Sequence, residues 1–280
     1  ASDVYKRQIQ EGRKVPKIDI GNAEIYCEER GDGEPIMLVP GLGGGGGVWF
    51  NQVAALSNDY RTIIHDHRGC GQSSYSLIEY SVDQMAADAV KLMDTLEIER
   101  VHWVGHSTGG AMGQIVAQDY PDRLASLILS ATWPGQDEYF NRAFAARKSV
   151  LSTMGTAEYA RHSILTLLPP WFITQNPEKI AELEGYLAGA DQPVEIMESR
   201  IDAICAYDRR DRMSDINVPV LVIVAEDDMV TPRYLSDQLA AGIVGAEKII
   251  LPTGGHFVLH VLVDEYNTAI SDFIKRHQMV

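Results

Sequence analysis

The sequence predicts an α/β fold with a mostly parallel central sheet, helices on both faces and an inserted helical cap. Short apolar runs alternate with helical patterns along most of the 280 residues. The alternation stops at residue 133 and resumes after residue 212, which indicates an insertion between two strands of one sheet. We therefore expect a core of residues 16–132 and 213–280 and a helical cap of residues 133–212. Residues 1–15 show no periodicity, and we interpret them as a disordered or expression-derived terminus.

The first element is a predicted hairpin, because the turn pair Gly21-Asn22 separates two extended stretches, 18–20 and 24–29. It should add an antiparallel edge to the sheet. The parallel strands are predicted where short, continuously apolar runs end in turn residues. These runs are 35–39, 61–65, 101–104, 124–130, 218–225 and 248–251.

The core helices are predicted from amphipathic patterns that follow the strands. They are 48–56, 81–96, 111–120, 232–242 and 264–278. Ser81 is the expected N-cap of the second helix, with Asp83 and Gln84 in its first turn. Within the insertion, Pro169-Pro170 and Pro177 predict breaks between helices.

Composition excludes several classes of partner. The formal net charge of −15, with no basic stripe, argues against nucleic-acid binding, which needs clustered Lys and Arg. No run of about 18 apolar residues is present, so no membrane span or membrane partner is expected. The three scattered cysteines fit reduced thiols in a cytoplasmic protein better than a disulfide framework. The sequence does not determine the oligomeric state, and a homodimer is one alternative.

The most informative stretch is Gly105-His106-Ser107-Thr108-Gly109, because it joins a predicted strand to a predicted helix. In that context G-x-S-x-G predicts a nucleophile elbow, a sharp turn that holds the serine in a strained conformation with its hydroxyl outward. The two glycines are needed because a Cβ at either position would collide with the neighbouring strand or helix. A Gly-Ser turn without catalytic function is the alternative interpretation of this motif.

A serine nucleophile needs a base, and the base needs an orienting acid. In elbow hydrolases they follow in the order serine, acid, histidine, at the carboxyl ends of later strands. His256 is the predicted base, because it follows the last strand and two glycines. Asp228 is the predicted acid, with Asp227 as the second choice, because only one of two adjacent carboxylates can reach the imidazole. The other should cap the helix that starts near Pro232 or face water.

The oxyanion formed during attack on a carbonyl needs donors that are fixed in advance. We expect one to be the backbone N–H of Thr108, at the N-terminus of the helix after the elbow. The second should come from the glycine-rich loop after strand 35–39, where Leu42 is best placed.

The chain resembles the α/β-hydrolase superfamily over nearly its whole length. The matching motifs are Pro40-Gly41-Leu42-Gly43, Asp66-His67-Arg68-Gly69-Cys70-Gly71-Gln72-Ser73, Gly105-His106-Ser107-Thr108-Gly109-Gly110, Asp228-Met229-Val230-Thr231-Pro232 and Gly255-His256. Within the superfamily it is similar to 3-oxoadipate enol-lactonases, aminoacrylate hydrolases and related carboxylesterases. Pro40 departs from the histidine of many members, but a backbone donor at Leu42 does not depend on that side chain.

This resemblance implies a serine hydrolase that cleaves a small ester, lactone or activated amide through an acyl-enzyme, without a cofactor or metal. It also implies that Asp66 and Arg68 brace their loop. Hydrolysis of a carbon–carbon bond and perhydrolysis are alternative reactions, because they use the same residues. A ligand receptor on the same fold is a further alternative, although three intact catalytic residues favour turnover.

The cap should determine which small molecule binds. Trp133 directly follows a strand and is expected at the pocket mouth. An apolar substrate site is predicted from the aromatic residues Trp133, Phe140, Phe144, Trp171 and Phe172, although aromatics at helical spacing are usually core. Arg200, Arg209 or Arg210 are candidates to bind a substrate carboxylate, with solvation as the alternative.

Two other kinds of site are consistent with parts of the sequence. Gly41-x-Gly43-x-x-Gly46 with Asp66 after the next strand fits a dinucleotide-binding oxidoreductase, but that reading leaves the other motifs unexplained. His65 and His67 share one strand face and could hold a metal, but no third ligand is evident.

Overall fold

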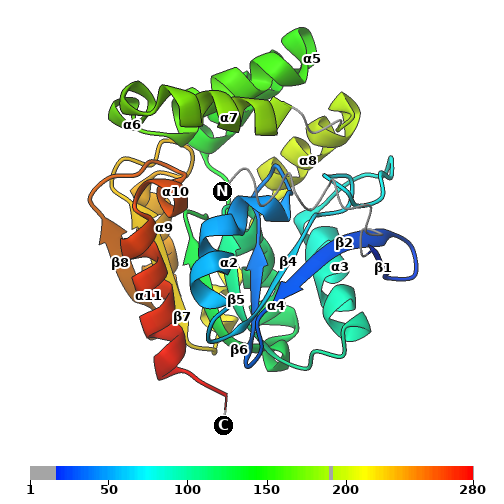
Figure 1. The fold of residues 1–280 in the computed structure, drawn as a ribbon, viewed down its shortest axis with the longest axis vertical. Coiled ribbons are helices and arrows are strands. Elements are labelled where there is room, and N and C mark those ends of the chain that lie inside the picture. Colours follow the sequence, from blue (N-terminus) through cyan, green and yellow to red (C-terminus); the bar gives the residue numbers. More distant parts are fainter. Residues whose placement is uncertain (1–16, 189–191, 280) are drawn as a thin grey trace.

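The computed structural model describes residues 17–188 and 192–279 and confirms the α/β class (Figure 1). The prediction for residues 1–15 lies outside the described residues. An eight-stranded sheet with strand order β1-β2-β4-β3-β5-β6-β7-β8 forms the centre. The strands are β1 (Lys17–Asp19), β2 (Glu24–Arg30), β3 (Pro35–Val39), β4 (Arg61–His65), β5 (Val101–His106), β6 (Leu124–Ser130), β7 (Val220–Ala225) and β8 (Glu247–Leu251).

The sheet is antiparallel at one edge and parallel elsewhere, as the hairpin prediction required. β1 pairs antiparallel with β2, and β2 pairs antiparallel with β4. From β4 to β8 every neighbouring pair is parallel. All residues of β5, β6 and β7 are buried, which matches their continuous apolar sequences.

Helices pack on both faces of the sheet (Figure 1). On one side α2 contacts α11, and on the other α3 contacts α4, which also packs on β5 and β6. The core helices are η1 (Gly46–Trp49), α2 (Phe50–Leu56), α3 (Val82–Thr95), α4 (Thr108–Asp119), η2 (Pro121–Arg123), α9 (Arg233–Gly242), α10 (Val258–Val261) and α11 (Val263–Arg276). The predicted cap of α3 is present, because the Ser81 hydroxyl accepts a hydrogen bond from the Gln84 amide at 3.0 Å.

The helical segment between β6 and β7 leaves the sheet and returns to it, because these two strands are neighbours. Its elements are α5 (Glu138–Leu167), α6 (Pro170–Gln175), α7 (Pro177–Ala188), α8 (Val194–Ala206) and η3 (Arg210–Asp215). We call α5 to α8 the cap helices; α5, α6 and α7 lie above one end of the sheet in Figure 1. Proline begins α6 and α7, as predicted, and Gly155 kinks α5 with a φ of +82°.

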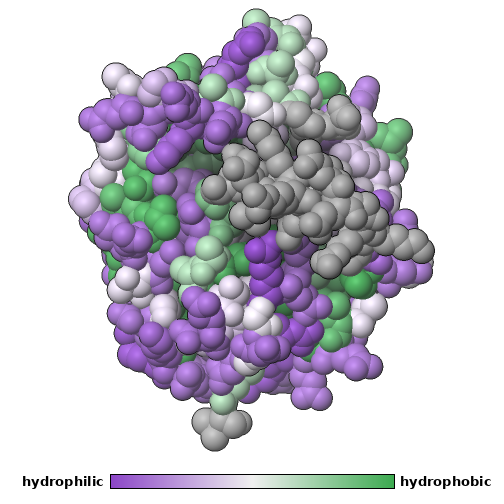
Figure 2. All heavy atoms as spheres, viewed as in Figure 1, coloured by the Kyte–Doolittle hydropathy of each residue, from purple (hydrophilic) through white to green (hydrophobic). Residues whose placement is uncertain are grey.

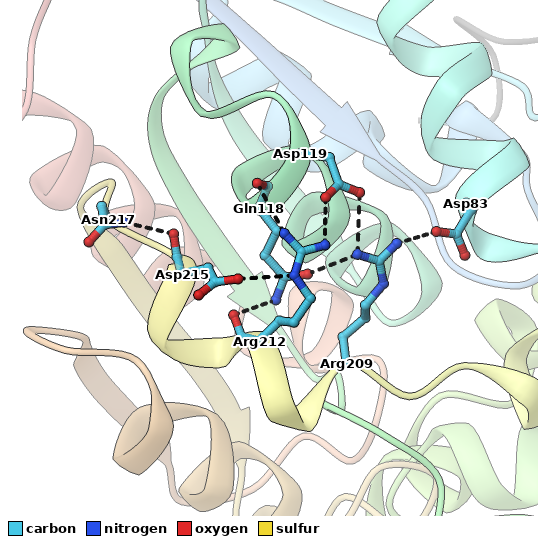
Figure 3. A network of polar contacts seen from close by, with 7 residues as sticks. All are labelled: Asp83, Gln118, Asp119, Arg209, Arg212, Asp215 and Asn217. Carbon is cyan, nitrogen blue, oxygen red and sulfur yellow. Dashed lines mark hydrogen bonds and ion pairs between the residues drawn. The ribbon is translucent and has the colours of Figure 1, made fainter.

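Ion pairs fasten the return from the cap to the core (Figure 3). Arg209 pairs with Asp83, and its Nη1 is 3.2 Å from Asp119 Oδ2. Arg212 Nη1 is 2.7 Å from Asp119 Oδ1, and its Nε is 3.0 Å from Asp215 Oδ2. The network therefore joins the segment before β7 to α3 and α4.

The face shown in Figure 2 is mostly hydrophilic, with separate apolar patches. Among the residues the structure describes, no helix has the length and apolarity that crossing a bilayer requires.

Candidate active site

Ser107 occupies a strained turn between β5 and α4. Its φ of 54° and ψ of −118° are rare for a residue with a side chain. Two contacts to the end of β6 hold this turn: the Ser107 amide donates to Ser130 O at 2.8 Å, and the Thr132 hydroxyl donates to Ser107 O at 2.8 Å. The helix begins at Thr108, earlier than the expected Ala111, so its first turn starts directly beside the serine.

The flanking glycines are required by contact with the backbone. A Cβ on Gly105 would lie 2.2 Å from Gly109 O, and a Cβ on Gly109 would lie 2.2 Å from Val39 O. Both distances are far below any real carbon–oxygen contact. This arrangement has the geometry of a nucleophile elbow.

The imidazole of His256 is hydrogen-bonded to Asp228. His256 Nδ1 is 2.9 Å from Asp228 Oδ2, and only 3% and 4% of the two residues is exposed. Asp228 Oδ1 accepts from the Val230 and Thr231 amides at 2.8 and 3.0 Å, while the Thr231 hydroxyl donates to Oδ2 at 2.9 Å. The carboxylate is therefore fixed by its own loop, and His256 is oriented through Nδ1. The part that Thr231 plays was not predicted, although its spacing three residues after the aspartate is a usable signal.

Asp227 has a different position from the one expected. It neither caps the next helix nor points only to water: Oδ2 accepts from the Thr253 hydroxyl and Oδ1 accepts from the Gly255 amide, at 2.6 and 2.8 Å. Both partners belong to the loop that carries His256. The two adjacent carboxylates thus separate into one that bonds the imidazole and one that braces its loop.

The chain neighbour of Ser107, His106, has its ring centroid 4.8 Å from that of His256. Ser107 is 6% exposed. Within the described part of the chain, the Ser107 hydroxyl makes no hydrogen bond, so the hydrogen bond between Asp228 and His256 does not extend to Ser107. Catalytic hydrogen bonds of this kind often tighten only when substrate binds.

The turn that carries Leu42, one of the two expected oxyanion donors, contacts Ser107 at Gly41, and Thr108, the other, directly follows the serine in the chain. Gly41 approaches the serine so closely that a Cβ built on it would be 3.1 Å from Ser107 Cβ. The turn continues through Leu42 and is closed by a hydrogen bond from the Gly44 amide to Gly41 O at 2.9 Å. Neither the Leu42 nor the Thr108 amide donates a hydrogen bond to any described residue, so both donors are available.

The expected aromatic site in the cap is partly a packed core. Trp133 is fully buried, so its expected position at a pocket mouth is wrong. Its ring lies 4.8 Å from that of Phe140, which lies 4.5 Å from that of Phe144, and Tyr207 closes the stack at 6.0 Å from Trp133. These contacts between aromatic rings join α5 to the segment that follows β6.

The remaining aromatic candidates are at the cap surface. Trp171 is 40% exposed and donates from Nε1 to the Thr253 hydroxyl at 3.1 Å, next to the His256 loop. Phe172 is partly buried and packs edge-to-face on Trp171, at 5.7 Å between ring centroids.

The three arginine candidates are all engaged with the protein. Arg209 is in the ion-pair network of Figure 3, and Arg210 pairs with Asp208. Arg200 is fully buried and donates to Leu42 O and to His67 Nδ1. None of the three is therefore placed as a free binding group for a substrate carboxylate.

The side chains that a dinucleotide or a metal would need, Asp66 and His67, form hydrogen bonds within the protein. Asp66 Oδ1 and Oδ2 accept from the Gly46 and Gln72 amides at 2.7 and 2.8 Å, so this carboxylate braces two loops and does not face a ribose. Burial raises the pKa of Asp66 to about 6. His67 Nδ1 is occupied by Arg200, and no group of three or more metal-ligating side chains is present between residues 17 and 279 where the structure describes them. Arg68 forms a buried ion pair with Asp88 at 2.8 Å, as a bracing role requires.

Comparisons with known proteins agree with this geometry. A family model described as the alpha/beta hydrolase fold matches residues 34–261. A protein of Azorhizobium caulinodans named "Putative carbamate hydrolase RutD" is 35% identical over 259 residues, covering 92% of this chain and 98% of that protein.

Two solved structures have nearly the same fold. The enol-lactonase from Burkholderia xenovorans LB400 has a TM-score of 0.87 and 26% identity, covering 93% of this chain and 100% of that one. A thermophilic esterase from Thermogutta terrifontis has a TM-score of 0.85 and 23% identity, covering 95% and 100%, and shows likeness of fold alone.

Proposed function

Because this chain belongs to the α/β-hydrolase family, we propose that it is a serine hydrolase of small esters, lactones or carbamates that works through an acyl-enzyme. The observation that carries the proposal is the buried His256–Asp228 hydrogen bond at 2.9 Å, together with a strained Ser107 whose chain neighbour His106 packs against His256. The substrate classes are supported by the names of its relatives, a carbamate hydrolase and an enol-lactonase.

In the proposed reaction the Ser107 oxygen attacks the substrate carbonyl and passes its proton to His256 Nε2. Asp228 holds the imidazole by Nδ1 and stabilises the imidazolium that forms. The Leu42 and Thr108 amides bind the oxyanion, a contribution of several kcal/mol in comparable sites. His256 then protonates the leaving alcohol or amine, and water attacks the acyl-enzyme with the same base.

The proposed substrate is a small molecule, and we propose no cofactor. We place the reaction in the cytoplasm, which the three free cysteines support because thiols remain reduced there.

The test is hydrolysis of p-nitrophenyl acetate, a γ-lactone and a phenyl carbamate by wild type and by Ser107→Ala. We expect loss of the nucleophile to lower kcat by about 10⁵-fold or more, as in comparable triads. A fluorophosphonate should label wild type at Ser107 only, as read by peptide mass spectrometry.

Ser149→Ala is the matched control, because Ser149 is exposed on α5. It should retain full activity. Retained activity in Ser107→Ala, or labelling at another residue, would refute the assignment of the nucleophile.

A further inference from the structure

Arg200 is a fully buried cation with neutral partners. It lies on cap helix α8, and its Nε and Nη2 donate to Leu42 O at 3.2 and 2.9 Å. Nη2 also lies 2.9 Å from His67 Nδ1, and Nη1 lies 3.5 Å from Arg68 O. No carboxylate among the described residues forms an ion pair with it. A buried charge without a counter-ion is costly, so its placement calls for a reason.

Arg200 holds Leu42 O, which belongs to the turn from Gly41 to Gly44. We call this turn the oxyanion turn, because Leu42 is an expected oxyanion donor. Leu42 and Gly43 are the central residues of the turn from Gly41 to Gly44, whose closing hydrogen bond is 2.9 Å long. The peptide between the two central residues of such a turn can take two opposite orientations, which distinguish type I from type II turns. Two guanidinium donors on Leu42 O fix that peptide, in the same turn whose Gly41 contacts Ser107 and whose Leu42 amide is an expected oxyanion donor.

The surroundings of the guanidinium keep it in place. His67 must accept at Nδ1 and is therefore neutral; burial and the charge of Arg200 both lower the pKa of His67 well below its usual value. The Arg200 guanidinium also stands 5.8 Å from the ring centroid of Tyr80. The Tyr80 amide donates to Ser199 Oγ at 3.1 Å, which seats α8 on the loop after β4.

We propose that Arg200 is a positioning residue through which the cap holds the oxyanion turn in its catalytic shape, an inference that rests on the proposed hydrolase function. Lysine could not replace it, because a single ammonium cannot place two donors on one carbonyl while a third reaches His67. Seating of α8 and stabilisation of the oxyanion are thereby coupled, although Arg200 does not touch the substrate.

The test compares Arg200→Met and Arg200→Lys with wild type on p-nitrophenyl acetate. We expect kcat to fall about 10- to 100-fold with KM changed less than about 3-fold, because a displaced turn weakens one oxyanion donor and removing a donor outright costs about 10²–10³-fold. The Ki of a trifluoromethyl ketone, whose bound form carries an oxyanion, should rise in proportion to the fall in kcat. The melting temperature should fall by several degrees, because the buried acceptors Leu42 O and His67 Nδ1 lose their donors, and circular dichroism should show that each variant still folds.

Arg209→Met is the matched control. Arg209 joins the segment between α8 and β7 to α3 and α4 and forms no hydrogen bond with the turn from Gly41 to Gly44 among the described residues. Its kcat and Ki should stay within about 3-fold of wild type. In Arg200→Ala, added guanidinium at non-denaturing concentration should restore part of the lost kcat. If Arg200→Met does not fold, Arg200→Lys carries the same comparison with the charge retained.

The inference is overturned if both Arg200 variants keep wild-type kcat, if Ki does not follow kcat, or if Arg209→Met loses as much activity. Failure of the proposed function is distinguishable, because wild type would then neither turn over the ester nor be labelled at Ser107.

Discussion

The nucleophile elbow and the cap helices differ in how tightly their residues are packed. Around Ser107 every residue of β5 and of α4 up to Gln118 is buried, and Gly105 and Gly109 have backbone oxygens 2.2 Å from where a Cβ would be. In the cap, Gly185 has nothing within 4 Å of that point, and Leu165 is 65% exposed on α5. The elbow tolerates almost no change in shape, whereas the cap helices have room on their outer sides.

This difference shows which parts of the molecule are expected to tolerate amino-acid substitution. Elements that set the angle of the attacking serine are fixed by close backbone contacts. The cap helices contact the loops of the candidate site through individual side chains, such as Arg200, which donates to Leu42 O.

A large effect is expected at the acid, which lies in the loop after β7, outside both regions. Asp228→Asn should lower kcat by about 10⁴-fold with the fold kept, because the amide favours the wrong imidazole tautomer. Hydrolysis of p-nitrophenyl acetate measures it. Asp227→Asn is the matched control; it keeps an acceptor for the His256 loop and should cost about 10-fold or less. The assignment of the acid is reversed if Asp227→Asn is the more damaging of the two.

Gly109→Ala sharpens the comparison on stability. Its Cβ would meet Val39 O at 2.2 Å, so we expect a loss of about 3 kcal/mol or more in the free energy of unfolding, measured in urea. Gly185→Ala, on exposed α7, should instead gain about 0.5–1 kcal/mol, because alanine is the better helix former. Equal effects at the two positions would contradict the contrast.

A smaller effect is expected from pH and arises in the core. Burial lowers the pKa of His65 to about 4, and burial also lowers the pKa values of His67 and His106. These histidines are neutral when folded but take up protons near pH 6.5 when unfolded, so stability is lost as pH falls from about 6.5 towards 4. Asp66 acts in the opposite direction: its raised pKa makes stability fall as pH rises from about 4 to 6.

His65→Leu should reduce the pH slope of the unfolding free energy by about 1.4 kcal/mol per pH unit between pH 5 and 6, as one proton fewer is taken up on unfolding. Urea titrations at several pH values measure the slope. Thr174→Val, at an exposed position on α6, is the control and should leave it unchanged. An unchanged slope in His65→Leu would mean that this histidine is protonated in the folded protein.

Most of the fold and the central residues of the candidate site could be predicted because their signals are local. Continuous apolar runs indicate buried parallel strands, and glycines two residues either side of Ser107 report a turn too crowded for a Cβ. His256 and Asp228 are recognisable because each follows a strand at the same edge of the sheet, where parallel strands bring their carboxyl ends together.

Only the tertiary structure decided which of two adjacent carboxylates meets the imidazole, that Trp133 is buried in an aromatic stack, and that Arg200 holds Leu42 O from 158 residues away. These outcomes depend on how distant segments pack, and a side chain's identity does not specify its partner. By itself, the sequence determined which chemical groups the site contains and which strand ends carry them. Packing determined which way each group points, because direction is set by neighbours that are far away along the chain.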